Sequence, residues 1–350
     1  MVGSGVVSDD HQNAAPALLV ESGVRRHGRL PARPVRVNPL DEFTGPSRLL
    51  RRLRLKEWAG FTLLHPDVWS SMIIQDAQYL ASCEIYAHDR RTGTLHQHAA
   101  NARGGSPALP EELLDGGHCA FDRPGHRLVY DFAEREGRHT IHVDVAATAT
   151  APAMSAELTL DARGAGAPLS VGSRLPGGGR MYTHKAVFPA EGVLRVGSTE
   201  YVFEPGRDLA ILDEHRSFLP YRTRWLWGTF ALPTADGPVG ANFADRPELP
   251  GEPEESAVWA PGACEPLGEI SFTPERPGDP AAPWRIASRD GRLDVVFAPE
   301  GRKTVRHRFG LLAIDYFQMY GRYRGVLRAG GAEYSLDGVH GVCESMRARL

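Results

Sequence analysis

The stretch DEHRSFLPYRTRWLWGTF, residues 213–230, gives the strongest indication of the fold. Side chains of a β-strand alternate between two faces, so a strand from Tyr221 to Ala231 places every second residue on one surface. One face then carries Thr223, Trp225, Trp227 and Thr229, and the other carries Arg222, Arg224, Leu226 and Phe230. The tryptophan face is either the flat apolar wall of a ligand pocket or part of a hydrophobic core, and both interpretations stay open.

The same alternation recurs in short runs elsewhere, and turn residues separate the runs. Alternating apolar positions are Ile141, Val143 and Val145, then Leu293, Val295 and Phe297, then Phe309, Leu311 and Ala313. Tight hairpins need residues that accept positive φ angles, which Asp236-Gly237, Asp290-Gly291, Gly330-Gly331 and Asp337-Gly338 supply. The pattern predicts a mostly β fold built as an antiparallel meander, with few short helices.

The length of the chain predicts more than one domain. Its 350 residues exceed what one hydrophobic core usually organises, and 42% hydrophobic residues suffice for a packed interior. Residues 1–34 lack a clear pattern and are expected to form a flexible leader. Glycines and prolines near residues 162–180 predict a connection between an N-terminal β-barrel-like domain, residues 35–175, and a C-terminal lipocalin-like domain, residues 181–350. The basic run from Arg48 to Lys56 is expected to face water, with a phosphate or membrane contact as the alternative.

Several classes of function are not supported. A formal charge of −3 provides no field that would attract nucleic acid or anionic lipid. The cysteines Cys83, Cys119, Cys264 and Cys343 form no CxxC pair, and no signal peptide or run of about 18 apolar residues is present. We therefore expect a cytoplasmic protein without stable membrane insertion. No dinucleotide, phosphate-loop or metal-ligand motif occurs in a usable context, so neither a cofactor nor a metal is expected.

Candidate proton-transfer residues precede the tryptophan strand. Asp213, Glu214 and His215 are expected in a loop at a barrel rim, where burial beside an apolar cavity would raise the pKa of a carboxyl group and let it protonate an alkene or carbonyl. They are equally compatible with a solvated turn. His184 is a second candidate acid or base, because imidazole titrates near neutrality, or a buried histidine at a domain interface.

A second polar and aromatic face is expected near the C-terminus. Tyr316, Gln318 and Tyr320 alternate with Asp315 and Phe317 along one predicted strand. Inside a barrel their hydroxyl and amide groups would contact a ligand; on an outer face they would contact water.

Several spaced motifs resemble the bacterial and fungal family catalogued as domain of unknown function 2804. They are Tyr182-Thr-His184-Lys185, residues 213–230, Gly240-Ala-Asn242-Phe, Glu255 followed by Trp259, Met319-Tyr-Gly321 and Gly338 to Glu344. The resemblance covers roughly residues 35–350, and it departs from the family at Ala241, Phe243 and Ser256. It implies two tandem lipocalin-like antiparallel β-barrels or half-barrels, similar to the architecture of the carotenoid hydratase and tocopherol cyclase group.

The resemblance also carries over a set of positions. These are His184, Lys185, Asp213, Trp225, Trp227, Asn242, Glu255, Trp259, Tyr320, Gly321 and Glu344. Our first hypothesis is a cofactor-independent hydratase, isomerase or cyclase acting on a hydrophobic polyene or terpenoid-like molecule. Its expected catalytic residues are Asp213, His215, Glu255 and His184. The expected substrate contacts are Trp225, Trp227, Asn242, Trp259, Tyr316, Gln318, Tyr320 and Arg224. The alternatives are a non-catalytic carrier of an apolar metabolite or lipid, and a structural or interaction protein. The oligomeric state stays open.

Overall fold

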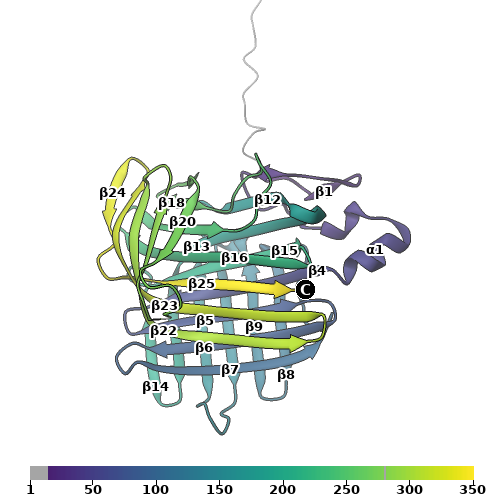
Figure 1. Ribbon diagram of the computed structural model, residues 1–350. Helices are drawn as coiled ribbons and strands as arrows, with labels where there is room; N and C mark the ends of the chain where they lie inside the picture. Colours follow the sequence, from purple (N-terminus) through teal and green to yellow (C-terminus); the bar gives the residue numbers. More distant parts are fainter. Residues whose placement is uncertain (1–14, 280) are drawn as a thin grey trace, which may run out of the picture.

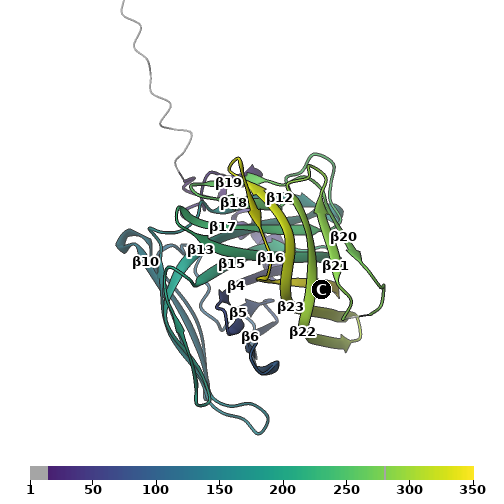
Figure 2. The ribbon, with the colours of Figure 1, turned by 90° about the vertical axis from the view of Figure 1, so that its left-hand side faces the viewer.

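Two large antiparallel sheets dominate the computed structural model, which describes residues 15–279 and 281–350 (Figure 1). The first has the order β7-β6-β5-β4-β15-β13-β11-β10-β9-β8, with β12 and β14 paired to β13 and β3 paired to β12. The second has the order β19-β18-β17-β16-β25-β23-β22-β21-β20, with β24 paired to β23. The predicted fold class is confirmed: the protein is mostly β, and its sheets are curled antiparallel half-barrels (Figure 2).

The bounds of the elements are as follows. The first sheet contains β3 (Gly28–Arg29), β4 (Leu55–Leu64), β5 (Val68–Asp76), β6 (Leu80–Asp89), β7 (Thr94–Arg103), β8 (Asp115–Arg123), β9 (His126–Ala133), β10 (Arg138–Val145), β11 (Met154–Asp161), β12 (Leu169–Leu175), β13 (Gly179–Val196), β14 (Thr199–Phe203) and β15 (Leu209–Phe218). The second contains β16 (Arg222–Thr234), β17 (Gly237–Asp245), β18 (Ala257–Ala260), β19 (Ala263–Pro266), β20 (Ile270–Pro274), β21 (Trp284–Ser288), β22 (Leu293–Phe309), β23 (Leu312–Ala329), β24 (Ala332–Ser335) and β25 (Val339–Arg349). A small pair, β1 (Val20–Glu21) and β2 (Val24–Arg25), precedes them, with the α-helix α1 (Gly45–Arg52) and the 3-10 helices η1 (Pro39–Glu42), η2 (Glu134–Glu136) and η3 (Pro176–Gly178).

The predicted turns are present. Gly291, with φ of 70°, joins the paired strands β21 and β22 in a hairpin. Gly338, with φ of 81°, lies in the turn between β24 and β25, but this is not the expected hairpin, because both strands pair with β23 and not with each other. The strand expected from Tyr221 to Ala231 is also confirmed, as β16.

Strand alternation divides the apolar side chains among three cores. Along β15, Ala210 and Leu212 pack inside the first half-barrel, while Leu209 and Ile211 point to the opposite face. The second half-barrel has its own core, which includes Phe230. A third cluster joins the outer face of the first sheet to the second sheet and contains Leu64, Trp69, Tyr86, Leu169, Val171, Val187, Leu209, Ile211, Trp227, Ala231, Ala244, Ala257, Trp259, Tyr320 and Val342. The contact between the sheets is therefore a hydrophobic core in its own right.

The chain passes from the first sheet to the second between Phe218 and Arg222. The connection expected near residues 162–180 instead contains β12, and its glycine-rich end, residues 176–180, falls between β12 and β13, which pair with each other. The division into domains at residues 175 and 181 stays a prediction, but the change of sheet comes about 40 residues later. It occurs inside the 213–230 segment, so this segment contributes to both sheets.

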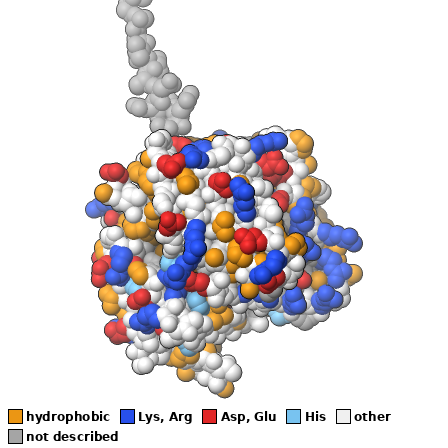
Figure 3. Space-filling view, turned by 60° about the vertical axis from the view of Figure 1, so that its left-hand side comes forward, with side chains coloured by type: hydrophobic (Ala, Val, Ile, Leu, Met, Phe, Trp, Pro, Cys, Tyr) orange, Lys and Arg blue, Asp and Glu red, His pale blue; other side chains and the backbone are white. Residues whose placement is uncertain are grey.

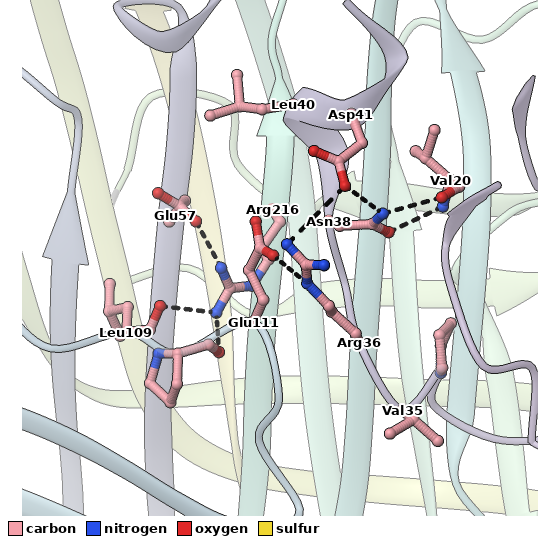
Figure 4. Close-up of polar contacts among 12 residues, drawn as sticks. Val20, Val35, Arg36, Asn38, Leu40, Asp41, Glu57, Leu109, Glu111 and Arg216 are labelled. Atoms are coloured by element: carbon pink, nitrogen blue, oxygen red, sulfur yellow. Dashed lines mark hydrogen bonds and ion pairs between the residues drawn. The ribbon is translucent and has the colours of Figure 1, made fainter. Parts of the chain in front are cut away.

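The segment expected to be a flexible leader lies partly outside the described residues, at 1–14. Residues 15–34 lie against the first sheet, where β3 pairs with β12. The amide of Asn38 anchors them by bonding the backbone N and O of Val20, both at 2.9 Å (Figure 4). Arg33 is buried and makes a bidentate contact with Glu214 at 2.6 and 2.7 Å.

Charged groups are widely distributed over the surface. The basic segment expected to face water does so along the exposed helix α1, where Arg48 pairs with Asp41 at 2.8 Å. The expectation is wrong for Lys56, which is buried because it lies at the start of β4 inside the sheet. Over the face in Figure 3, acidic and basic side chains are interspersed with apolar ones. No helix in the described part of the chain is long and apolar enough to cross a membrane.

Candidate functional site

A pocket of about 100 Å³ lies at one end of the contact between the two sheets. The first sheet and the segment after it contribute Trp58, Leu175, Pro176, Met181, Lys185, Asp213, His215, Leu219 and Pro220. The second sheet and the loop after β17 contribute Arg222, Thr223, Arg224, Trp225, Trp227, Arg246, Pro247, Glu255 and Glu344. The pocket therefore brings together three predicted catalytic residues, Asp213, His215 and Glu255, with three predicted substrate contacts.

The register of the first sheet explains which polar groups reach the pocket. Lys185 on β13 lies directly opposite Asp213 on β15, and His215 follows two positions later on the same face. This is the face that Leu209 and Ile211 direct toward the second sheet. The expectation that residues 213–215 form a loop is wrong, because they continue β15 in register with both β13 and β4. Their positions are thus set by a rigid sheet interior.

Two carboxylates and three basic groups, contributed by both walls, form a largely buried network. The Lys185 Nζ lies 2.9 Å from Asp213 Oδ1 and 3.6 Å from Glu255 Oε2. The His215 Nε2 lies 3.7 Å from each of the same two oxygens. Arg246 approaches the other oxygen of Glu255, with Nη1 at 3.2 Å. The imidazole is therefore placed between two carboxylates.

Within this network, Lys185 and Glu255 hold each other in their charged forms. Burial acts to lower the pKa of Lys185, but Asp213 and Glu255 outweigh it and raise the pKa above its ordinary value. Burial acts to raise the pKa of Glu255, but Lys185, His215 and Arg246 hold it well below its ordinary value. Glu255 is consequently an ionised anchor for its neighbours. An ionised carboxylate carries no proton to transfer, so Glu255 is poorly suited to be the proton donor.

The His215 ring also stacks on an aromatic side chain. Trp58 on β4 is its cross-strand neighbour, and the ring centroids lie 4.3 Å apart at an interplanar angle of 21°. The Nδ1 atom of His215 is buried and has no hydrogen-bond partner among the described residues. Stacking fixes the orientation of the ring, and the free nitrogen can accept or donate a proton.

The opposite wall carries a carboxyl group in a different environment. Glu344 on β25 accepts hydrogen bonds of 2.9 Å from Trp225 Nε1, Tyr316 Oη and Gln318 Nε2. No ion pair to Glu344 occurs within residues 15–279 and 281–350, and the nearby Asp213 adds negative charge. Burial raises the pKa of Glu344 above its ordinary value, although the three hydrogen bonds oppose the shift. Tyr316 and Gln318 therefore contact a pocket carboxyl group rather than the cavity itself.

Trp227 is held from two sides. Its Nε1 donates to Asn242 Oδ1 at 2.8 Å, and the Asn242 amide donates to the Glu255 carbonyl at 2.8 Å. The Lys185 ammonium lies 4.8 Å from the Trp227 ring centroid. The ring face thus already stabilises a cation of the protein, and Asn242 positions the wall from behind.

Three predicted residues lie away from the pocket. Trp259 is fully buried in the core between the sheets, and Tyr320 packs there beside His88 with ring centroids 4.2 Å apart. His184 points to the opposite face of β13, toward Glu214 and Arg33. Successive side chains of a strand point to opposite faces of the sheet, so His184 and Lys185 lie on different sides although they are adjacent in the sequence.

The buried state of His184 gives a first prediction. Burial lowers its pKa to about 3, whereas an unfolded chain takes up this proton near pH 6.5. The free energy of unfolding therefore falls as the pH drops from about 6.5 toward 3, and between pH 7 and 5 His184 contributes about 2 kcal/mol to this loss. Urea unfolding of the variant His184→Gln should show a correspondingly smaller difference between these two pH values. An unchanged difference would contradict the assignment of His184 as a neutral structural residue.

Trp58 and Arg246, which contact the buried network, were not singled out from the sequence. Trp58 reaches His215 only through the long-range pairing of β4 with β15, and Arg246 depends on the path of the loop after β17. Lys185 and Glu344 are among the positions that the family resemblance carries over. No local pattern indicates that these two groups face each other across the same cavity. Among the described residues, no cluster of His, Cys, Asp and Glu could hold a metal ion.

Comparisons with known proteins identify a family. A family model described as Domain of unknown function (DUF2804) matches residues 19–350. A search of curated protein sequences finds no match. Among solved structures, kievitone hydratase from Nectria haematococca is similar with 12% identity and a TM-score of 0.45, over 84% of this chain and 88% of that one. CghA with Sch210972 is similar with 12% identity and a TM-score of 0.49, over 85% of this chain and 88% of that one.

Proposed function

We propose that this chain, which belongs to the DUF2804 family, is a cofactor-independent acid–base enzyme acting on an apolar small molecule bound between its two sheets. The observation that carries the proposal is the pair of carboxyl groups in one pocket, Glu344 and Glu255, whose pKa values are shifted in opposite directions. Such a pair supplies a proton donor and a fixed negative charge at the same pH.

Glu344 is the proposed proton donor. A neutral carboxyl group transfers its proton to an alkene carbon of the bound molecule, which leaves a carboxylate and a carbocation. The three donors from Trp225, Tyr316 and Gln318 then stabilise the carboxylate. Burial favours the neutral acid before the transfer, and the three hydrogen bonds stabilise the charge that forms afterwards.

His215 is the proposed base on the facing wall, and Asp213 and Glu255 orient it and stabilise its protonated form. It receives a proton from water that adds to the carbocation, which is a hydration. It can instead receive a proton from a neighbouring carbon, which completes an isomerisation or a cyclisation. Exchange with solvent returns one proton to Glu344 and removes one from His215.

The remaining walls suit an apolar ligand. Leu175, Met181, Leu219 and Pro220 line the pocket beside the ring of Trp225. An apolar lining with a few convergent polar groups is typical of small-molecule sites. These features support a polyene or terpenoid-like substrate, in which an alkene provides the carbon that is protonated.

The experiment is native mass spectrometry with organic extraction of the protein after gentle purification. We expect a retained apolar compound in the wild type, and a loss of about tenfold or more in Trp225→Ala, because the variant removes one wall of the pocket. The matched control is Trp284→Phe, which changes a tryptophan in the separate core of the second sheet. Circular dichroism confirms that each variant folds. Equal retention by wild type, Trp225→Ala and the control would place the ligand outside this pocket and contradict the proposal.

A further inference from the structure

Six arginines gather on the face of the second sheet opposite Trp225, Trp227 and Glu344, at the strand ends that lie beside the pocket. Arg224, Arg347, Asp315 and Arg306 lie side by side on β16, β25, β23 and β22. Two positions nearer the strand ends, Arg222, Arg349, Ala313 and Arg308 form a parallel set on the same four strands. Residues two apart on a strand share a face, so these arginines form one surface, here called the arginine rows. The rows lie at the end of β25 that Figure 1 marks with C.

Few acidic side chains neutralise the positive charge of the arginine rows. Asp315 is the one acidic residue within these two sets of positions, and it pairs with Arg306 at 3.1 Å. Arg349 contacts the Gly310 carbonyl at 3.5 Å. The side chains of Arg222, Arg224, Arg308 and Arg347 have no hydrogen bond or ion pair in the described part of the chain and are exposed. Neighbouring strands are about 4.8 Å apart, so these like charges repel one another unless an anion lies between them.

The rows and the pocket share two residues. Arg222 and Arg224 begin β16 and line the pocket at its mouth, although alternation places them on the face of the strand opposite Trp225 and Trp227, which continue the pocket wall. The basic groups deeper in the pocket differ, because Lys185 and Arg246 are paired with Asp213 and Glu255. Free positive charge is thus confined to the mouth.

We propose that the ligand of the pocket carries an anionic group, a phosphate or a carboxylate, which Arg222 and Arg224 bind at the mouth while the apolar part enters between the sheets. The inference rests on the proposed function and narrows its substrate class. Guanidinium groups match the geometry of both anions through two parallel hydrogen bonds. On β16, the pocket has a basic mouth at Arg222 and Arg224 and an apolar wall at Trp225 and Trp227. An amphipathic molecule has an anionic end and an apolar end that match these two parts.

The experiment measures binding of three probes by isothermal titration calorimetry: decyl phosphate below its micelle concentration, decanol and inorganic phosphate. The wild type should bind decyl phosphate about tenfold or more tightly than decanol, and more tightly than inorganic phosphate. The double variant Arg222→Gln with Arg224→Gln should lose this advantage, so that it binds decyl phosphate and decanol with similar affinities. The control is Arg285→Gln with Arg289→Gln, which removes the same charge from exposed positions on and after β21 and should retain the advantage.

The outcomes separate this inference from the proposed function. Equal affinities for decyl phosphate and decanol, both abolished by Trp225→Ala, would overturn the inference but leave the proposed function intact, because proton transfer to an alkene needs no anionic group. An advantage that persists in the Arg222→Gln and Arg224→Gln double variant would also overturn it. Binding of inorganic phosphate as tight as that of decyl phosphate, unaffected by Trp225→Ala, would show that the rows do not serve the pocket.

Discussion

Replacing Glu344 with glutamine should lower the rate at which the protein converts its retained compound by about 100- to 10,000-fold, the range expected for loss of a general acid. Glutamine keeps an oxygen that accepts from Trp225, Tyr316 or Gln318 and nearly the same volume, so the fold and the binding of the compound should persist. Single-turnover conversion of the recovered compound measures the rate, and extraction measures binding. A large loss of rate with retained binding is the result that distinguishes a proton donor from a structural carboxyl group.

The pH profile gives the same experiment a second readout. A proton donor acts in its protonated form, so the wild-type rate should fall as the pH rises through the raised pKa of Glu344. The control Glu333→Gln changes an exposed glutamate on β24 and should leave the rate and the profile unchanged. A Glu344→Gln variant with full activity would remove Glu344 from the mechanism.

Replacing Arg216 with methionine should lower the free energy of unfolding by about 3–5 kcal/mol, the cost of leaving a buried charge without its partner. The Arg216 Nη1 donates to Glu57 at 2.7 Å, and its Nη2 donates to the carbonyl of Leu109 at 3.1 Å (Figure 4). Its Nη2 also donates to the Pro110 carbonyl, and its Nε lies 3.2 Å from Glu214. Burial raises the pKa of Glu57 above its ordinary value even with Arg216 present. Urea unfolding followed by circular dichroism measures the change.

The matched control lies in the same region. Arg36 pairs with Glu111 at 2.7 Å, but its side chain is 42% exposed, so Arg36→Met should cost less than about 1 kcal/mol (Figure 4). Similar losses in both variants would mean that burial does not set the contribution of these ion pairs.

The architecture could be predicted because it depends on short-range patterns. Alternating apolar residues and Asp-Gly or Gly-Gly turns identify strands and hairpins directly, and the strand around Trp225 and Trp227 lies where the alternation places it. The position at which the chain changes sheet could not be predicted in this way. Residues 176–180 have the composition of a linker but form a tight connection within one sheet, because β12 pairs with β13 across them.

The site could be predicted only in part, for a similar reason. Asp213 and His215 follow from their nearness to the tryptophan strand, yet their shared network with Lys185 and Glu255 depends on pairing between strands far apart in the sequence. His184 illustrates the limit: its chemistry made it a candidate, but the alternation of β13 directs it away from the pocket. The opposite pKa shifts of Glu255 and Glu344 depend on burial and on charge partners, which the sequence does not display.

The most direct test of the proposed chemistry is the transfer of a solvent proton to carbon. The recovered compound is incubated with the protein in D₂O and examined by mass spectrometry and NMR. Proton donation from Glu344 to an alkene predicts a product with deuterium bound to one former alkene carbon in the wild type, and no such product with Glu344→Gln. If the wild type returns the compound unchanged and without deuterium while still binding it, the protein is a carrier and the acid–base account is wrong.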